Sequence, residues 1–262
     1  MEYHQGKVIW ADLVTPDLAD AEHFYGGLFG WTFQTVLHGD SDYAVAFLDG
    51  RPIAGILQKP IPQNEKRQPA WLTFLAVRDL KSASEIALKQ GAKSLATSRT
   101  YAGRGSQSIF ADPEGAVFAM LASSSGDTPD YLASPGDWIW SSLIARDPKQ
   151  SADFYKAVFG YDVFDLVPSD DGAEHVILST DDYARAGIHS LQPGHRHSHW
   201  LNFIRVVDAV ASSAKAVTLG GRVLIPPRLD RQGGQVAVIA DPTGAPLGLM
   251  EWTAADSKVE PK

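Results

Sequence analysis

Three histidines alternate just before residue 200 and are the first candidates for chemistry. His195, His197 and His199 are each separated by one residue. Alternate residues of a β-strand share one face, so three imidazoles in this pattern could converge on a divalent metal ion. The alternative is a solvated polar connector that follows a Pro-Gly pair. We take the connector as the main interpretation and the metal site as the weaker one.

A carboxylate stands beside an indole near the beginning of the chain. Asp12 lies in an otherwise apolar run, two residues after Trp10, so both side chains would share one face of a strand. Asp12 could anchor a ligand or act as a general base, or it could be a structural partner of a backbone N–H or an arginine. In the second half of the chain Ser142 follows Trp140 at the same spacing. We therefore expect the two halves to carry different sites.

Further ligand-binding candidates are aromatic and basic residues. A flat or apolar ligand could stack on tryptophans, and a guanidinium could hold an anionic group through two hydrogen bonds. Each candidate also has a structural interpretation, as a core residue for the tryptophans and as a surface or ion-pairing residue for the arginines. The candidates are Trp10, Trp71, Trp140, Trp200, Arg104 and Arg205.

An internal repeat indicates which elements position these residues. The run KVIWADLVTPDLADAEHFYGGLFGW (residues 7–31) is answered by DWIWSSLIARDPKQSADFYKAVFGY (residues 137–161). A turn that begins Asp112-Pro recurs as Asp241-Pro. Similarity at a nearly constant offset indicates that the chain is a duplication.

Each half of the chain contains two similar units. In each unit an apolar strand precedes a helix with periodic apolar residues, and three shorter strand candidates follow. Four βαβββ units are therefore expected, over residues 7–58, 70–122, 137–190 and 199–252. Paired, they predict an α+β fold in which each pair forms a concave mixed sheet with helices outside. The cleft of such a sheet is a natural place for a small molecule.

The units combine into two tandem domains. The first is expected over residues 1–122 and the second over residues 137–252. Residues 123–136 are rich in Ser, Gly, Pro and Asp and are predicted to be the linker, and residues 253–262 form a polar tail.

Composition and charge restrict the partners and the kinds of site that the chain could have. The formal net charge is −8 and the pI is near 5.4, which argues against nucleic acid and anionic membrane surfaces as partners. The chain has no cysteine, so disulfides and cysteine-based zinc sites are excluded. No apolar run approaches the roughly 18 residues that span a bilayer, and the amino end has no hydrophobic signal segment. We expect a cytoplasmic protein, while a processed amino terminus and homodimer formation stay open.

Several of these motifs resemble the vicinal oxygen chelate superfamily, which includes glyoxalase I, extradiol dioxygenases and the bleomycin and fosfomycin resistance proteins. The resemblance rests on the FYxxLFGW run, the Ala54-Gly55 and Ala186-Gly187 pairs and the DPxGA turns, and it covers nearly all of residues 7–252. It implies the fold. The tandem arrangement is most similar to glyoxalase-like proteins of unassigned activity, and chemistry must be argued from the site.

The resemblance also implies where a metal would be bound. Metal-using members place histidine in first strands and glutamate or histidine in later strands. The corresponding residues here cannot bind a metal: Trp10, Trp140, Leu72, Leu201, Ala119 and Gly248. Glu251 lies three residues beyond the last of these positions, and so on the other face of its strand. We expect the usual metal site to be absent from both domains and predict no cofactor, with a divalent metal at the histidine cluster as the alternative.

The leading hypothesis is a metal-independent small-molecule-binding protein of the glyoxalase and bleomycin resistance type. Its ligand would be aromatic or amphipathic and held in an aromatic-lined cleft. The alternative is an enzyme, a lyase, isomerase or oxygenase, that uses Asp12 or a non-standard metal at His195, His197 and His199. A third hypothesis is a scaffold whose clefts are filled by side chains. The ligand, and whether one or both clefts function, stay open.

Overall fold

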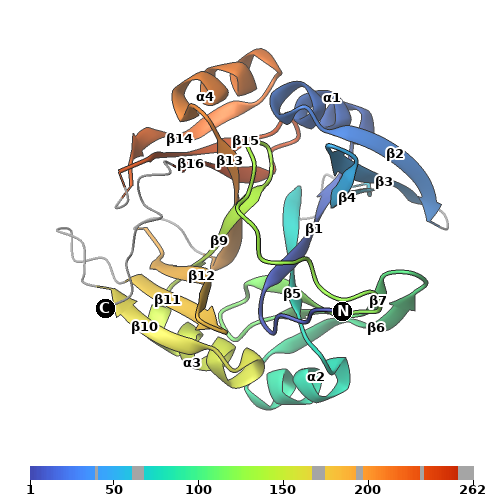
Figure 1. Ribbon diagram of the computed structural model, residues 1–262, viewed down its shortest axis with the longest axis vertical. Helices are drawn as coiled ribbons and strands as arrows, with labels where there is room; N and C mark the ends of the chain where they lie inside the picture. Colours follow the sequence, from blue (N-terminus) through green and yellow to red (C-terminus); the bar gives the residue numbers. More distant parts are fainter. Residues whose placement is uncertain (39–40, 61–67, 167–174, 193–196, 231–232, 253–262) are drawn as a thin grey trace. The chain divides into compact units, whose positions relative to one another are not determined.

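The structure is a computed structural model that describes residues 1–38, 41–60, 68–166, 175–192, 197–230 and 233–252. Strands and helices follow one another in the same order in both halves of the chain (Figure 1). The first half contains β1 (Val8–Thr15), α1 (Leu18–Phe29), β2 (Thr32–His38), β3 (Ser41–Leu48), β4 (Arg51–Gln58), β5 (Ala70–Ala76), α2 (Leu80–Lys89), β6 (Lys93–Tyr101), β7 (Gly105–Ala111) and β8 (Val117–Ser123). The second half contains β9 (Trp138–Ala145), α3 (Pro148–Phe159), β10 (Asp162–Leu166), β11 (His175–Thr180), β12 (Tyr183–Ser190), β13 (His199–Val206), α4 (Ala209–Thr218), β14 (Arg222–Leu229), β15 (Gln235–Ala240) and β16 (Pro246–Glu251).

Each half of the chain forms an eight-stranded mixed sheet. The strand order is β2-β3-β4-β1-β5-β8-β7-β6 in the first and β10-β11-β12-β9-β13-β16-β15-β14 in the second. The first and last strands of each βαβββ unit pair in parallel, because a helix crosses over between them, while the later strands pair as antiparallel neighbours. The predicted α+β class with two tandem domains is confirmed. The boundaries at residues 122, 137 and 252 stay predictions.

The chain divides into two compact units, and each unit contains segments from both repeats. The α2/α3 unit consists of Met1–Ala11, Leu72–Tyr131 and Trp140–Leu201. The α1/α4 unit consists of Asp12–Trp71, Leu132–Ile139 and Asn202–Lys262. In each unit two helices from different repeats contact each other, α2 with α3 and α1 with α4 (Figure 1). Each unit therefore combines elements from both repeats.

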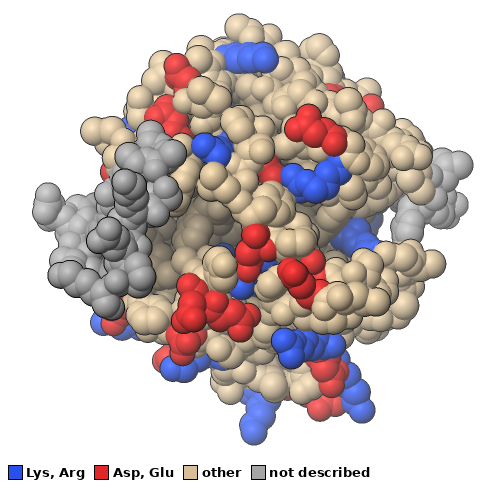
Figure 2. Space-filling model, in the orientation of Figure 1, with Lys and Arg blue, Asp and Glu red and all other residues tan. Residues whose placement is uncertain are grey.

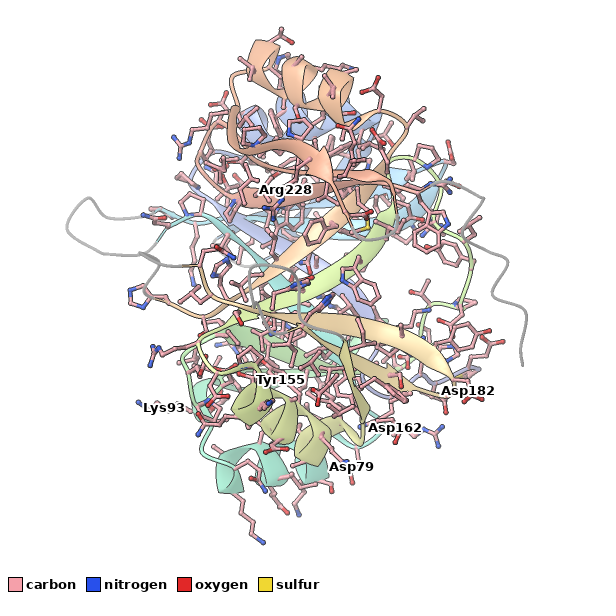
Figure 3. The ribbon with its side chains drawn as sticks, turned by 90° about the vertical axis from the view of Figure 1, so that its left-hand side faces the viewer. Asp79, Lys93, Tyr155, Asp162, Asp182 and Arg228 are labelled. Atoms are coloured by element: carbon pink, nitrogen blue, oxygen red, sulfur yellow. The ribbon has the colours of Figure 1, made fainter. Side chains whose placement is uncertain are left out.

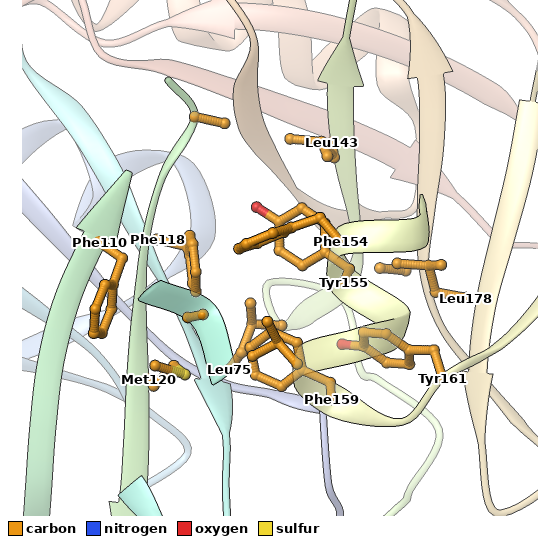
Figure 4. Packing of buried hydrophobic residues seen from close by; sticks show 14 of the residues in the cluster. Leu75, Phe110, Phe118, Met120, Leu143, Phe154, Tyr155, Phe159, Tyr161 and Leu178 are labelled. Carbon is orange, nitrogen blue, oxygen red and sulfur yellow. The ribbon is translucent and has the colours of Figure 1, made fainter. Parts of the chain in front are cut away.

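The core of the α2/α3 unit is built from apolar side chains of both repeats. Phe118 of β8 packs against Phe154, Tyr155 and Phe159 of α3, with ring centroids 6.1, 5.5 and 6.2 Å apart (Figure 4). The same cluster contains Leu75, Phe110 and Met120 from the first repeat and Leu143, Tyr161 and Leu178 from the second. Burying one such side chain stabilises a fold by about 1.5–3 kcal/mol. Much of this core would be exposed to water if either repeat were removed.

A chain of hydrogen bonds crosses this core. The indole N–H of Trp200 donates to Tyr155 Oη at 2.9 Å, and that hydroxyl donates to Asp112 Oδ2 at 3.1 Å (Figure 3 labels Tyr155). Asp112 Oδ1 accepts the backbone N–H groups of Glu114 and Ala116, both at 2.9 Å. Burial raises the pKa of Asp112, and these hydrogen bonds oppose the rise. Burial also raises the pKa of Tyr155 well above its ordinary value, so its hydroxyl stays a donor.

The α1/α4 unit repeats this arrangement. Trp71 Nε1 donates to Tyr25 Oη at 3.0 Å, and Tyr25 donates to Asp241 Oδ2 at 3.0 Å. Asp241 Oδ1 accepts three backbone N–H groups of its own turn at 2.8–2.9 Å. Trp71 and Trp200 are each only 6% exposed. Both are core residues that contact helices, which agrees with the structural interpretation of these tryptophans and not with the ligand-binding one.

A charged network ties the amino-terminal segment to the linker within the α2/α3 unit. Asp130 Oδ1 accepts hydrogen bonds from Arg185 Nη1 at 2.6 Å and Lys7 Nζ at 2.8 Å. Lys7 Nζ also donates to the carbonyl oxygens of Thr128 and Pro129, at 2.6 and 2.8 Å. Burial would raise the pKa of Asp130, but the hydrogen bonds from Arg185 and Lys7 outweigh it and lower the pKa.

We expect Asp130→Asn to lower the free energy of unfolding at pH 7 by roughly 2 kcal/mol, because Arg185, whose side chain is 3% exposed, loses its anionic partner. The lowered pKa sets the pH dependence. The contribution of Asp130 is complete above its ordinary pKa of 3.8 and is lost as the pH falls through the lower folded value. Urea denaturation at pH 7 and pH 3 should show the difference between variant and native protein shrinking in acid.

The matched control is Asp181→Asn. Asp181 lies 3.9 Å from Arg185 but is 65% exposed, so its loss should change stability by no more than about 0.5 kcal/mol. A difference for Asp130→Asn that does not depend on pH would contradict the assignment.

The surface carries acidic and basic side chains interspersed on the face shown in Figure 2. In the part of the chain that the structure describes, no helix has the length and apolar character needed to cross a membrane.

Candidate ligand site

Side chains alternate along each strand, so one set packs against the helices and the other lies on the opposite face, which we call the helix-free face. On β5, Trp71 contacts Tyr25 of α1, and the alternation therefore places Leu72 and Phe74 on the helix-free face. Trp10 of β1 packs beside them in a small apolar cluster. The other members of this cluster are Ile9, Ile109, Ala119 and Leu121.

Arg104 covers two aromatic rings of this cluster. Its guanidinium carbon lies 4.7 Å from the centroid of Phe74 and 5.2 Å from the ring of Trp10. A guanidinium that stacks on aromatic faces presents its N–H groups in its own plane, where they can bind a carboxylate or phosphate through two hydrogen bonds. The structure thus brings together two of the candidates, Trp10 and Arg104.

Gln107 adds an acceptor to the same face. It pairs with Leu121 of β8, a member of the apolar cluster. Its side-chain oxygen Oε1 is buried and has no hydrogen-bond donor among the described residues. A buried acceptor without a donor costs about 1–3 kcal/mol, and an O–H or N–H group of a ligand would remove that cost. Gln107 was not predicted from the sequence, because its place depends on the register of β7 on β8.

Asp12 forms a second polar group, on the strand that carries Trp10. Asp12 is 9% exposed, and its carboxylate accepts a hydrogen bond from Tyr43 Oη at 2.9 Å. Gly55 pairs with Asp12 and makes room for this bond. A Cβ atom at residue 55 would lie 1.9 Å from the Tyr43 hydroxyl and 2.2 Å from Asp12 Oδ1. Glycine is therefore needed in the Ala54-Gly55 pair, because a side chain there would collide with the hydrogen-bonded groups of Tyr43 and Asp12.

The corresponding place in the second repeat holds different chemistry. Trp140 Nε1 donates to Ser142 Oγ at 3.1 Å. The imidazoles of His175 and His189 stack beside them, with ring centroids 3.8 Å apart and planes 26° from parallel. Gly187 lies under these groups as Gly55 does in the first repeat. Trp140 and Ser142 are recognisable in the sequence, whereas the neighbourhood of His175 and His189 depends on the pairing of β11 with β12.

The remaining candidates lie elsewhere. Arg205 donates from Nη1 to the carbonyl oxygen of Ala133 at 2.5 Å and from Nη2 to that of Trp252 at 3.3 Å, so it ties down backbone. His195 lies outside the described residues. His197 is exposed, and His199 Nδ1 is 3.0 Å from the His197 carbonyl oxygen.

Comparison with known proteins decides the family. The model of the Glyoxalase/Bleomycin resistance protein/Dioxygenase superfamily matches residues 7–120 and again residues 137–249. The chain belongs to this superfamily. It is 30% identical over 253 residues to "Putative glyoxylase CFP32" of Mycobacterium bovis, covering 95% of this chain and 96% of that protein. It is also 30% identical to "Anthracycline biosynthesis protein DauV" of a Streptomyces species, covering 95% and 94%.

Solved structures of the glyoxalase and dioxygenase superfamily support the fold. The Mn(II)-bound glyoxalase from Novosphingobium aromaticivorans superposes with a TM-score of 0.65 at 14% identity, covering 95% of this chain and 83% of that one. The 2,3-dioxygenase LapB from a Pseudomonas species gives 0.64 at 14% identity, covering 96% and 94%. At such low identity these likenesses concern the fold alone.

The residues at the superfamily's usual metal positions do not fit a metal. In the first repeat these positions belong to the apolar cluster: Trp10, Leu72 and Ala119. In the second repeat the ring of Phe203 fills the space over Gly248, where a Cβ atom would meet it at 2.1 Å. Among the described residues no three His, Cys, Asp or Glu side chains are grouped to hold a metal ion.

Glu251 is also accounted for by the fold. Its carboxylate accepts the backbone N–H of Ala209, at the start of α4, at 2.8 Å and that of Gln235 at 3.1 Å. The carboxylate therefore accepts backbone N–H groups at the start of α4 and at the start of β15. This agrees with the expectation that Glu251 lies on the face of β16 opposite to the usual metal position.

Proposed function

We propose that this chain is a small-molecule-binding protein that holds a planar aromatic ligand on the helix-free face of its first repeat without the superfamily's usual metal. The observation that carries the proposal is Arg104 stacked over Trp10 and Phe74. The partly exposed ring of Trp10 would contact the apolar body of a ligand and the guanidinium would bind an acidic group, while the buried ring of Phe74 supports the guanidinium from below. The buried oxygen of Gln107 adds a place for one O–H or N–H donor.

These groups together define a ligand class. It is a fused aromatic ring system that carries a carboxylate or similar anion and a hydroxyl group. The name of one relative, an anthracycline biosynthesis protein, is consistent with aromatic chemistry in this branch of the superfamily. Such a site works by packing and hydrogen bonding, so binding should need no metal ion.

Probes of this class test the proposal directly. A panel of hydroxy-2-naphthoates offers the ring, the carboxylate and the hydroxyl, while 2-naphthoate lacks the hydroxyl and 2-naphthol lacks the carboxylate. Tryptophan fluorescence should respond to the hydroxynaphthoates because Trp10 lies in the site. No response to any of these probes would favour a scaffold without a ligand.

Gln107→Leu should separate recognition from packing. We expect it to weaken binding of a hydroxynaphthoate by about tenfold, because the hydroxyl loses its acceptor, a change of about 1.4 kcal/mol. Binding of 2-naphthoate should be unchanged, since that probe has no hydroxyl for the glutamine. Equal losses for both probes would mean that Gln107 acts only through packing.

An acid–base enzyme is the second candidate, and the contact between Asp12 and Tyr43 favours it. The carboxylate lies two residues from Trp10 on the same face of β1, where it could accept a proton from a bound molecule. Asp12→Asn separates the two functions. Loss of turnover of a bound hydroxynaphthoate with unchanged affinity would support the enzyme, and a native protein that binds the probe without altering it would support the binding protein.

A further inference from the structure

A groove lies between α2 and the strands β6 and β7 of the α2/α3 unit, on the face of the sheet that carries the helix. Its volume is about 760 Å³, and sites for small molecules usually measure about 300–1,000 Å³. Ser106 and Ser108 of β7 line the groove, whereas Gln107 between them faces the opposite side of the sheet. The groove is therefore separate from the ligand site on the helix-free face.

Hydroxyl groups dominate the lining of this groove. They come from five serines on three elements: Ser84, Ser94, Ser98, Ser106 and Ser108. Ser84 Oγ donates to the carbonyl oxygen of Leu80 at 2.6 Å, and Ser106 Oγ lies 2.7 Å from Thr100 Oγ1. A serine hydroxyl has one donor and two acceptor lone pairs, so both can still accept a hydrogen bond from a bound molecule.

Ser108 lies deepest among these serines and points to a ligand most directly. The residue is 4% exposed, yet its hydroxyl forms no hydrogen bond with any residue that the structure describes. A buried hydroxyl without a partner costs free energy, and a polar group of a bound molecule that reached Ser108 would remove that cost.

The second repeat shows that the fold does not require this polar lining. β6 pairs with β7 as β14 pairs with β15, with irregularities at the same places, so residues 129 apart correspond. The second repeat has an aliphatic side chain at three of these places: Val223 for Ser94, Ile225 for Ala96 and Ala237 for Ser108. There α4 packs against β14, β15 and β16, whereas α2 packs mainly against β7 and β8. The hydroxyls of the first repeat are thus not needed for the βαβββ topology.

Charged side chains of both signs surround the groove. Arg78 and Lys81 lie near the start of α2 beside Asp79 and Glu85, and all four are exposed. The Asp79 carboxylate already accepts the backbone N–H groups of Lys81 and Ser82, at 3.0 and 3.1 Å, so this end of the helix is occupied by its own cap. Two cationic and two anionic groups offset each other, which favours a neutral ligand over an ion.

We propose that the groove binds a neutral polyhydroxylated molecule, such as a sugar. The hydroxyls of a sugar both donate and accept hydrogen bonds, and so do those of the serines. One of them would pair with the buried Ser108. The small side chains of Ala96 and Ala122 leave room for the ring and contact its C–H groups. The proposal goes beyond the proposed function and does not depend on it.

The test is an NMR titration of the isotope-labelled native protein with four neutral sugars: glucose, N-acetylglucosamine, maltose and sucrose. We expect at least one of them to shift the backbone amide signals of Ser84, Ser94 and Ser108 and to leave the indole N–H signal of Trp10 unchanged. Inorganic phosphate, the anionic probe, should shift none of these signals. The proposal is overturned if no sugar shifts the serine signals, or if phosphate shifts them more than every sugar does.

Two variants introduce residues that the second repeat carries at the same places. Ser108→Ala should weaken sugar binding about five- to tenfold, because one hydrogen bond is lost. Ala96→Ile should abolish binding, because the larger side chain fills the groove. The matched control is Ser82→Ala, an exposed serine of α2 outside the groove, and it should bind sugars normally.

Circular dichroism confirms that each variant is folded. All three variants should bind hydroxynaphthoates as the native protein does, so failure of this proposal and failure of the proposed function give different results. Sugar binding at native affinity in both Ser108→Ala and Ala96→Ile would overturn the proposal.

Discussion

Replacing Asp112 by alanine is expected to lower the free energy of unfolding by about 3–5 kcal/mol. The side chain is 3% exposed, and its carboxylate accepts one hydroxyl and two backbone N–H groups. Alanine would leave the hydroxyl of Tyr155 and the turn without acceptors inside the core. Because whole domains are stable by only about 5–15 kcal/mol, the variant should unfold far more easily.

Denaturation in urea measures this effect, and Asp79→Ala is the matched control. Asp79 caps the amino end of α2 through its carboxylate but is exposed, so its loss should cost only about 1 kcal/mol. Tyr155→Phe should fall between the two, at about 1–3 kcal/mol, because it removes one hydroxyl and keeps the ring. If Asp112→Ala and Asp79→Ala lowered the free energy of unfolding by similar amounts, the buried chain of hydrogen bonds would contribute little to stability.

The second large effect concerns binding. Trp10→Ala is expected to weaken hydroxynaphthoate binding by about 30- to 100-fold, since it removes ring stacking and one of the two faces under Arg104. The measurement is calorimetric titration, because the variant loses the one of the seven tryptophans that is expected to report on this site by fluorescence. Trp140→Ala is the matched control in the second repeat and should bind these probes normally. Equal losses in both variants would place the ligand elsewhere.

Much of the fold follows from the sequence repeat. The positions of Trp10 and Trp140 and the paired Asp-Pro turns predict four βαβββ units, and the sheet order confirms them. The sequence does not reveal that Tyr25 bonds to Asp241, or Tyr155 to Asp112, because each pair joins different repeats. These contacts between repeats depend on tertiary packing, which a local pattern does not encode.

The candidate site follows from the sequence only in part. Trp10, Asp12 and Arg104 are chemically conspicuous and were predicted, whereas Trp71 and Trp200 carry the same chemistry but point to the helices. The alternation of side chains along a strand separates these cases. Leu72 is aligned with the superfamily's metal ligand, and Trp71, one residue earlier, therefore lies on the opposite face of β5.

Other residues of the two sites could not be predicted because their neighbours are set by the register between adjacent strands. Gln107 and the pair His175 and His189 acquire their neighbours from register, and a one-residue shift would move each to the other face. The Ala-Gly motif marked the place where the two histidines meet, but the motif alone gives no register for the neighbouring strand.

The most direct test of ligand binding without the usual metal is titration of a hydroxy-2-naphthoate into protein before and after removal of metal ions with a chelator. The positions of Trp10, Leu72 and Ala119 offer no metal ligand, so the affinity should be the same in both samples. Loss of binding in the chelator-treated protein, restored by adding back a divalent ion, would contradict the account.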